Sequence, residues 1–340
     1  VEVAAVVVQD SERSVVVLVR GLDAEEWTSR AIVLDGLRVP PRALRAVDAD
    51  QDGRTDLAVF TAREPIRLLL NRSDGSFEAA TELAGFQRGL LDDVDSSAFS
   101  TGDVDADGHA EMLVASGAFA RALRLSSQGR LVVVDQFNAR SSETSVGAAA
   151  VWDPDGDGVD DIVLVHEDGS VVELLERGRD GVFRYAESAT AHPVALQGAK
   201  VLDLGRGTGS DLLLFGDSAV TWMTTDGDEL AVVTTAIYET DLKDVEHDML
   251  VTGDLGGPPG SEIVLLDTEG TRVREILGLL ENGVWGSLLH FTIFEADPHY
   301  EGQQGSQREP RAALVADVTD DGLDDLVLLL HDRLLIDSQE

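Results

Sequence analysis

Aspartates recur along this chain in a spacing that suits the binding of a hard cation. One copy reads Asp153-Pro-Asp155-Gly-Asp157-Gly158 and closes with Asp161, ahead of an apolar Ile-Val-Leu run. Acids at positions 1, 3 and 5 of such a loop point three carboxylates at one centre, and glycine at position 6 permits the sharp turn. The carbonyl of position 7 adds an oxygen and the acid at position 9 closes the shell, so the pattern predicts a calcium loop.

Four copies keep this pattern and predict about four Ca²⁺ sites. A helix-flanked calcium loop would have Glu at position 12, where the first copy has Val59 inside an apolar run, so an EF-hand is excluded. Two further copies, at 203–211 and 254–262, keep only the outer acids, and no metal is expected there. The expected ligands, with the carbonyl residue fourth in each set, are Asp48, Asp50, Asp52, Arg54 and Asp56; Asp103, Asp105, Asp107, His109 and Glu111; Asp153, Asp155, Asp157, Val159 and Asp161; and Asp317, Thr319, Asp321, Leu323 and Asp325.

The acidic loops recur at nearly regular intervals along most of the chain. Their leading acids stand at 48, 103, 153, 203, 254 and 317, which gives intervals of 55, 50, 50, 51 and 63 residues. The N-terminal apolar run from Glu2 matches the end of a further copy, so we count seven repeats. A period near 50 residues is typical of propeller blades.

Each period also contains a hairpin behind the loop. Asp-Gly or Asn-Gly turns precede Phe77, Phe183 and Trp285 by two residues, and these turns connect strands. With the strand that leads into the loop, the unit has four strands. The sequence therefore predicts an all-β fold: a single β-propeller domain over 1–340 with seven four-stranded blades. It is expected to begin at the second strand of one blade and to end after the third strand of another, near Ile336.

Composition narrows the function classes. Acidic residues number 64 against 26 basic ones, and the net charge of −38 would repel a phosphate backbone, so nucleic acid is a poor partner. The same charge favours bound cations. The chain has no cysteine and no apolar run long enough for a membrane span, so no thiolate metal site and no membrane insertion are expected.

These residues resemble the FG-GAP/VCBS repeats, which also build the seven-bladed propeller of integrin α subunits. Phe99-Ser-Thr-Gly-Asp103 is similar to that family's approach to its calcium loop, and Asn71-Arg-Ser-Asp-Gly-Ser-Phe77 to the hairpin of VCBS units. The Phe-Gly and Gly-Ala-Pro tripeptides that name the repeat are not intact. The resemblance implies structural calcium loops that hold the first two strands of each blade, partners that bind through loops on the opposite face, and an extracellular, cell-surface or periplasmic location.

No catalytic constellation is evident. The seven histidines show no metal-binding spacing, most clustered carboxylates belong to the calcium loops, and the four tryptophans are expected to pack between blades. The leading hypothesis is an adhesion or recognition module for a glycan or an extracellular protein. A polysaccharide lyase or hydrolase and a structural segment of a larger surface protein are the alternatives. The longest interval adds residues around 295–310, where His299, Tyr300 and Arg308 are candidate partner contacts.

Overall fold

The computed structural model describes most of the chain and divides it into two compact units. The described residues are 2–9, 12–19, 27–83, 85–92, 94–191, 196–202, 204, 209–216, 219–226, 231–256, 261–280, 284–292, 309–330 and 333–338. Unit 1 comprises Val1–Asp153 and Gly158–Ala189, and unit 2 comprises Pro154–Asp157 and Thr190–Glu340. No helix among the described residues has the length and apolar character needed to cross a membrane.

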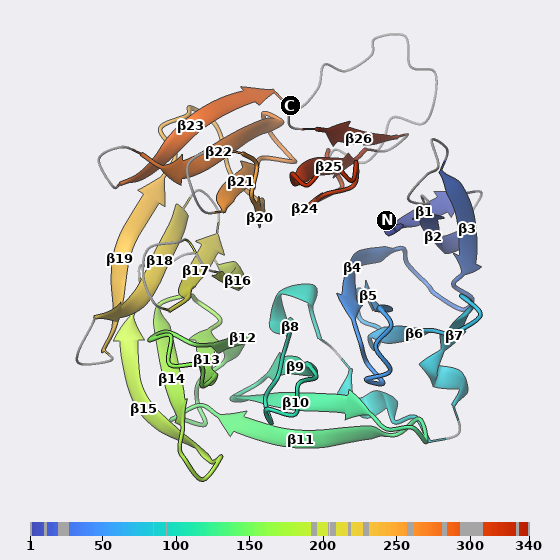
Figure 1. Ribbon diagram of the computed structural model, residues 1–340, viewed down its shortest axis with the longest axis horizontal. Helices are drawn as coiled ribbons and strands as arrows, with labels where there is room; N and C mark the ends of the chain where they lie inside the picture. Colours follow the sequence, from blue (N-terminus) through green and yellow to red (C-terminus); the bar gives the residue numbers. More distant parts are fainter. Residues whose placement is uncertain are drawn as a thin grey trace. The chain divides into compact units, whose positions relative to one another are not determined.

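Unit 1 contains four antiparallel sheets whose strands pair in chain order (Figure 1). Three short 3₁₀ helices, η1 (Ala80–Glu82), η2 (Arg88–Leu90) and η3 (Ser96–Ala98), connect the second sheet to the third. The strands are β1 (Glu2–Gln9), β2 (Glu12–Val19) and β3 (Thr28–Val33); β4 (Pro41–Val47), β5 (Asp56–Thr61), β6 (Arg67–Asn71) and β7 (Phe77–Ala79); β8 (Phe99–Gly102), β9 (Glu111–Ser116), β10 (Phe119–Leu125) and β11 (Leu131–Asn138); and β12 (Val146–Trp152), β13 (Asp161–His166), β14 (Val171–Arg177) and β15 (Phe183–Thr190).

Unit 2 contains three sheets of the same construction. Its strands are β16 (Leu196–Leu202), β17 (Asp211–Gly216), β18 (Ala219–Asp226) and β19 (Ala231–Glu239); β20 (Met249–Gly253), β21 (Glu262–Leu266), β22 (Val273–Leu279) and β23 (Trp285–Thr292); and β24 (Ala312–Ala316), β25 (Asp325–Leu329) and β26 (Leu334–Asp337). Within the described residues the first and last sheets have three strands and the five between them have four.

This architecture confirms the expected all-β propeller fold, and its strands follow from the apolar pattern. The second strand of each blade is a continuous apolar run, and in β5 all six residues are buried. A strand covered on both faces reads as such a run, whereas β15, the last strand of its sheet, alternates half-buried and exposed residues. The hairpins predicted before Phe77, Phe183 and Trp285 are β6–β7, β14–β15 and β22–β23.

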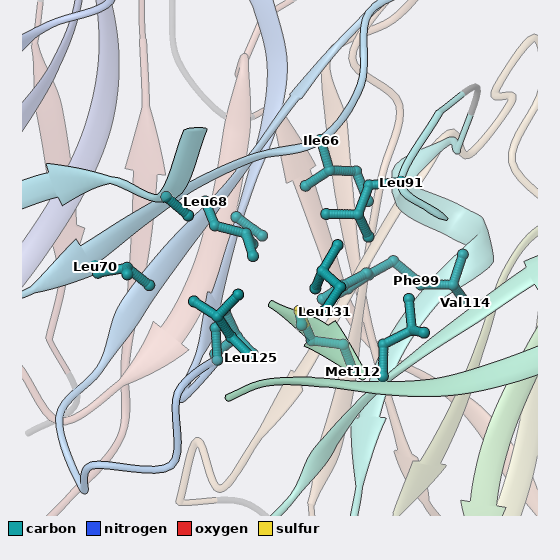
Figure 2. Close-up of a cluster of buried hydrophobic side chains, with 14 of the residues drawn as sticks. Ile66, Leu68, Leu70, Leu91, Phe99, Met112, Val114, Leu125 and Leu131 are labelled. Atoms are coloured by element: carbon teal, nitrogen blue, oxygen red, sulfur yellow. The ribbon is translucent and has the colours of Figure 1, made fainter. Parts of the chain in front are cut away.

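The hydrophobic core is divided into clusters, and each cluster joins two consecutive sheets. Figure 2 shows the cluster between the β4–β7 and β8–β11 sheets, in which Leu68 and Leu70 of one sheet meet Met112 and Leu125 of the other. In unit 2, Trp222 and Trp285 stack with ring centroids 5.4 Å apart. Burial of Trp152, Trp222 and Trp285 agrees with their predicted packing role. Within each unit, consecutive sheets are thus held together by apolar contact between their faces.

Candidate functional site

The acidic loops connect the first strand of a sheet to its second strand. In the first copy β4 ends at Val47, the leading acid Asp48 follows, and the closing acid Asp56 is the first residue of β5. The other closing acids likewise open β9, β13, β17, β21 and β25. Most are buried: Asp56, Glu111 and Asp325 are 0% exposed, Glu262 2% and Asp211 5%. The closing carboxylate of each loop therefore lies at the first residue of a core strand.

The leading acid folds the loop around its own side chain. The Asp48 carboxylate accepts hydrogen bonds from the backbone N–H groups of Asp52 at 3.0 Å and Gly53 at 2.9 Å. Gly53 has φ of +80°, a left-handed conformation that glycine adopts at little cost. The same two bonds recur from Asp107 and Gly108 to Asp103, and from Asp321 and Gly322 to Asp317.

The closing acid ties the loop to the sheet. Asp56 Oδ2 accepts from the N–H of Ala49 at 3.0 Å, and its Oδ1 accepts from the N–H of Asn71 in β6 at 2.7 Å. Leu255 donates to Glu262 in the same way at 2.8 Å, although that loop lacks inner acids. Because this bond forms with or without inner acids, we assign the outer acids a structural role. Val104 to Glu111 and Val318 to Asp325 are the equivalent bonds.

The inner acid at position 3 creates the candidate cation site. Carboxylate oxygens of Asp48, Asp50 and Asp56 lie within 4.8 Å of one another, as do those of Asp103, Asp105 and Glu111. Asp50 Oδ2 accepts from Arg72 at 2.9 Å, but its buried Oδ1 has no hydrogen-bond partner among the described residues. A buried oxygen without a donor is costly, and a bound cation would satisfy it.

The acid at position 5 has a different neighbour. Asp52 Oδ1 accepts from the N–H of Arg54 at 3.0 Å, and its Oδ2 forms an ion pair with the Arg54 guanidinium. Asp107 accepts from the N–H of His109 at 2.9 Å. The structure therefore brings together positions 1, 3 and 9 of these two predicted ligand sets, whereas the position-5 carboxylates bond to the backbone of position 7.

The electrostatics of the loops favour a positive charge at their centre. Burial raises the pKa of Asp56 to about 6; the N–H groups of Asn71 and Ala49 oppose this shift, and the nearby Asp50 and Asp52 carboxylates add to it. Burial also raises the pKa of Glu111. An ionised acid in such a place lacks a counter-charge, which a divalent cation would supply.

The loop at 317–325 differs at position 3, where Thr319 replaces an acid. Its hydroxyl donates to Asp325 Oδ2 at 3.1 Å, while the buried Asp325 Oδ1 has no hydrogen-bond partner in the part of the chain that the structure describes. Asp321 accepts from the N–H of Leu323 at 2.9 Å. This loop repeats the backbone geometry of the first two with one carboxylate fewer.

The loop at 153–161 crosses the division between the units. In unit 1, Asp153 accepts from the N–H of Gly158 at 3.1 Å, and Asp161 accepts from the N–H of Arg177 at 2.8 Å. Asp155 and Asp157 belong to unit 2, where Asp157 N–H donates to Asp155 at 3.2 Å. The position-7 residue of this loop, Val159, is exposed.

Neighbouring loops in unit 1 are in direct contact. The side-chain amide of Gln51, in the first loop, donates to Glu111 Oε1, in the second, at 2.8 Å. Gln51 holds φ of +56° at the apex of its loop. The closing acid of one candidate site is thereby fixed by the loop of the preceding blade.

Sequence reasoning missed two buried glutamates at equivalent positions. Glu173 is the third residue of β14 and Glu275 the third residue of β22. His166 lies 3.0 Å from Glu173, and His247, 1% exposed, lies 3.5 Å from Glu275. Alignment of the third strands of the repeats would have revealed this position.

His247 lies in a polar environment inside unit 2. Tyr238 donates to Glu275 at 2.7 Å, which fixes that carboxylate. Burial lowers the pKa of His247, and the carboxylates of Glu275, Asp267 and Asp248 oppose the shift. The His247 imidazole therefore loses its proton at a lower pH than a histidine in water does.

Some predicted positions lie outside the described residues. These are the candidate partner contacts His299, Tyr300 and Arg308, and the leading acid Asp203 of the loop at 203–211.

Comparison with known proteins supports the repeat assignment. Residues 48–114, which contain the first two acidic loops, match the model of the FG-GAP-like repeat family. No curated protein matches the chain. A solved protein from Lactobacillus plantarum has a similar fold, with a TM-score of 0.52 and 12% identity over 95% of this chain and 86% of that one. A protein of unknown function from Desulfotomaculum acetoxidans DSM 771 gives a TM-score of 0.49 and 10% identity over 84% of each chain.

Proposed function

We propose that this chain is a calcium-binding recognition module, because its sheets form a β-propeller and residues 48–114 match the FG-GAP-like repeat. The observation that carries the proposal is the carboxylate cluster of Asp48, Asp50 and Asp56, with its buried, unpartnered Asp50 oxygen. Calcium takes six to eight oxygen ligands from carboxylates and backbone carbonyls in flexible geometry. The donor set of these loops consists of such oxygens, so the residues fit the ion.

The ion would be held by the acids of the loops at 48–56, 103–111, 153–161 and 317–325, about four per chain. In each it would neutralise buried charge between the first two strands of a blade. Sites of this kind in extracellular modules bind calcium at 10⁻⁴–10⁻³ M. We therefore propose an extracellular, cell-surface or periplasmic location, where calcium is abundant.

The proposed role is binding of a glycan or an extracellular protein rather than catalysis. Apolar clusters join consecutive sheets of unit 1, and the closing acids Asp56 and Glu111 tie the first two loops to this scaffold. A rigid scaffold with exposed loops at both strand ends suits recognition.

A binding screen tests this proposal. The purified chain is applied to arrays of glycans and extracellular-matrix proteins, with millimolar calcium in one arm and a chelator in the other. We expect a ligand that is retained in calcium and lost in chelator. A hit that is equally strong in both arms would refute the calcium-dependent role, and no hit from a folded, calcium-loaded chain would refute recognition of these ligand classes.

A further inference from the structure

Unit 1 contains a cavity of about 330 Å³ that the calcium loops do not use. Its walls are Arg42 of β4, residues 60–64 at the end of β5, and residues 94–96 before β8. The loop at 48–56 joins the other ends of β4 and β5 (Figure 1). Since β5 has six residues, the cavity lies about 20 Å from that loop.

Two arginines of this cavity have no partner. Arg42 and Arg63 are both exposed, and in the described part of the chain neither guanidinium donates a hydrogen bond or forms an ion pair. Carboxylates are close at hand, because Glu64 and Asp95 line the same cavity. The chain has only 26 basic residues against 64 acidic ones, so a cavity in which two arginines balance the charge of two acids differs from the strongly acidic remainder of the chain.

The backbone holds Arg63 in an unfavourable conformation. Arg63 has φ of +61°, within a turn closed by a 3.1 Å hydrogen bond from Glu64 N–H to the Thr61 carbonyl. Left-handed residues also occupy the turns between the second and third strands of three other sheets, at Gly117, Gly169 and Arg272, so this conformation belongs to the turn. The turn places the Arg63 side chain at the cavity, where within the described residues it forms no hydrogen bond or ion pair.

The acids of the cavity restrict the kind of anion that would fit. Glu64 Oε1 accepts from the N–H of Arg38 at 3.0 Å, and Asp95 Oδ1 accepts from the N–H of Ser97 at 3.4 Å. Each carboxylate has a second oxygen that can accept from a ligand hydroxyl. A compact dianion such as phosphate would be repelled by these acids. A molecule with one carboxylate and several hydroxyl groups would pair with the arginines and donate to the acids.

We propose that this cavity binds a uronic acid residue of a polysaccharide. Its carboxylate pairs with Arg42 and Arg63, and its hydroxyl groups bond to Glu64, Asp95 and Ser96. The volume lies at the small end of the range for ligand sites, about 300–1,000 Å³, which suits one sugar residue of a longer chain. This inference rests on the proposed recognition function and names its ligand class.

Calorimetry with short oligogalacturonates tests the inference on the calcium-loaded chain. We expect the acid form to bind and its methyl ester, which keeps the ring but has no charge, not to bind. Arg42→Gln and Arg63→Asn should each lower the affinity about tenfold or more, because a charge-assisted hydrogen bond contributes about 1.5–3 kcal/mol. Asparagine tolerates the left-handed region, so Arg63→Asn should keep or raise the melting temperature while binding is lost.

Arg184→Gln is the matched control, because it removes the same charge from an exposed arginine that is paired with Asp180 on another sheet. It should leave the affinity unchanged. Equal binding of acid and ester, unchanged affinity of Arg63→Asn, equal competition by inorganic phosphate, or no binding at all would each overturn the proposal. A calcium-dependent ligand that is insensitive to Arg42→Gln and Arg63→Asn would leave the recognition function standing and exclude this cavity. Arginine-dependent uronate binding that is unaffected by chelator would support this cavity and refute the calcium dependence of recognition.

Discussion

The substitution Asp105→Asn separates the proposed metal role of an inner acid from its structural role. Asp105 belongs to the carboxylate cluster of the second loop, and its Oδ1 also accepts from the N–H of Asp107 at 3.2 Å. Asparagine keeps a carbonyl oxygen for that hydrogen bond and loses the charge. Calcium affinity should therefore fall while the loop backbone is preserved.

The expected magnitude follows from linkage. At a calcium concentration ten times its Kd, one site stabilises the folded chain by about 1.4 kcal/mol. Asp105→Asn should remove up to this amount in calcium and change the free energy of unfolding by less than about 0.5 kcal/mol in chelator. Denaturant unfolding followed by tryptophan fluorescence, in both conditions, measures the difference.

Asp254→Asn is the control for this experiment. Asp254 leads a loop without inner acids, and its Oδ1 accepts from the N–H of Gly256 at 3.1 Å, which asparagine can still do. Its effect should be the same with calcium and with chelator. A metal role of Asp105 is excluded if Asp105→Asn lowers the free energy of unfolding equally in calcium and in chelator, or if Asp254→Asn shows the calcium dependence instead.

Three further substitutions test the packing and the buried polar positions. Gly102→Ala should destabilise the chain by about 1–3 kcal/mol in denaturant unfolding, because a Cβ there would lie 2.3 Å from Val151 Cγ2; an unchanged midpoint would contradict this close approach. Trp222→Ala should cost about 3–5 kcal/mol in the same assay, and a loss below 1 kcal/mol would show that the stacked tryptophan pair is not a core element. His247 has a folded-state pKa below the 6.5 of the unfolded chain, so protonation of this group favours unfolding and the stability that it contributes should be lost as pH drops through 6.5. In thermal unfolding between pH 8 and 5, His247→Gln should remove this contribution and the exposed control His290→Gln should not; equal pH profiles of the wild type and His247→Gln would exclude His247 as a contributing group.

The parts of the fold that sequence predicted are those with a fixed spacing. Closing acids such as Asp56 stand eight residues after their leading acids and open a strand that must be apolar on both faces, so loop and strand appear together in the sequence. The hairpin turns before Phe77 and Phe183 have a conformational requirement that Asp-Gly meets. At these positions the residue types required by the turn recur at the same place in each repeat. The strands and hairpins were therefore predicted correctly.

Features that depend on contacts between distant segments were not predictable. Arg42 and Arg63 are separated by β4, the acidic loop and β5, and no pattern marks them as walls of one cavity. The left-handed conformation of Arg63 follows from its turn rather than from its residue type. The sequence also could not predict that Asp50 and Asp52 have different hydrogen-bond partners, because both acids fit the same spacing pattern.

Calcium titration of the metal-free chain by calorimetry measures whether the acidic loops bind the ion. We expect about four bound ions per chain with affinities near 10⁻⁴–10⁻³ M, and a loss of binding sites when inner acids such as Asp50 and Asp105 are changed to asparagine. The absence of binding at millimolar calcium, or a stoichiometry that these substitutions leave unchanged, would contradict calcium binding by these loops.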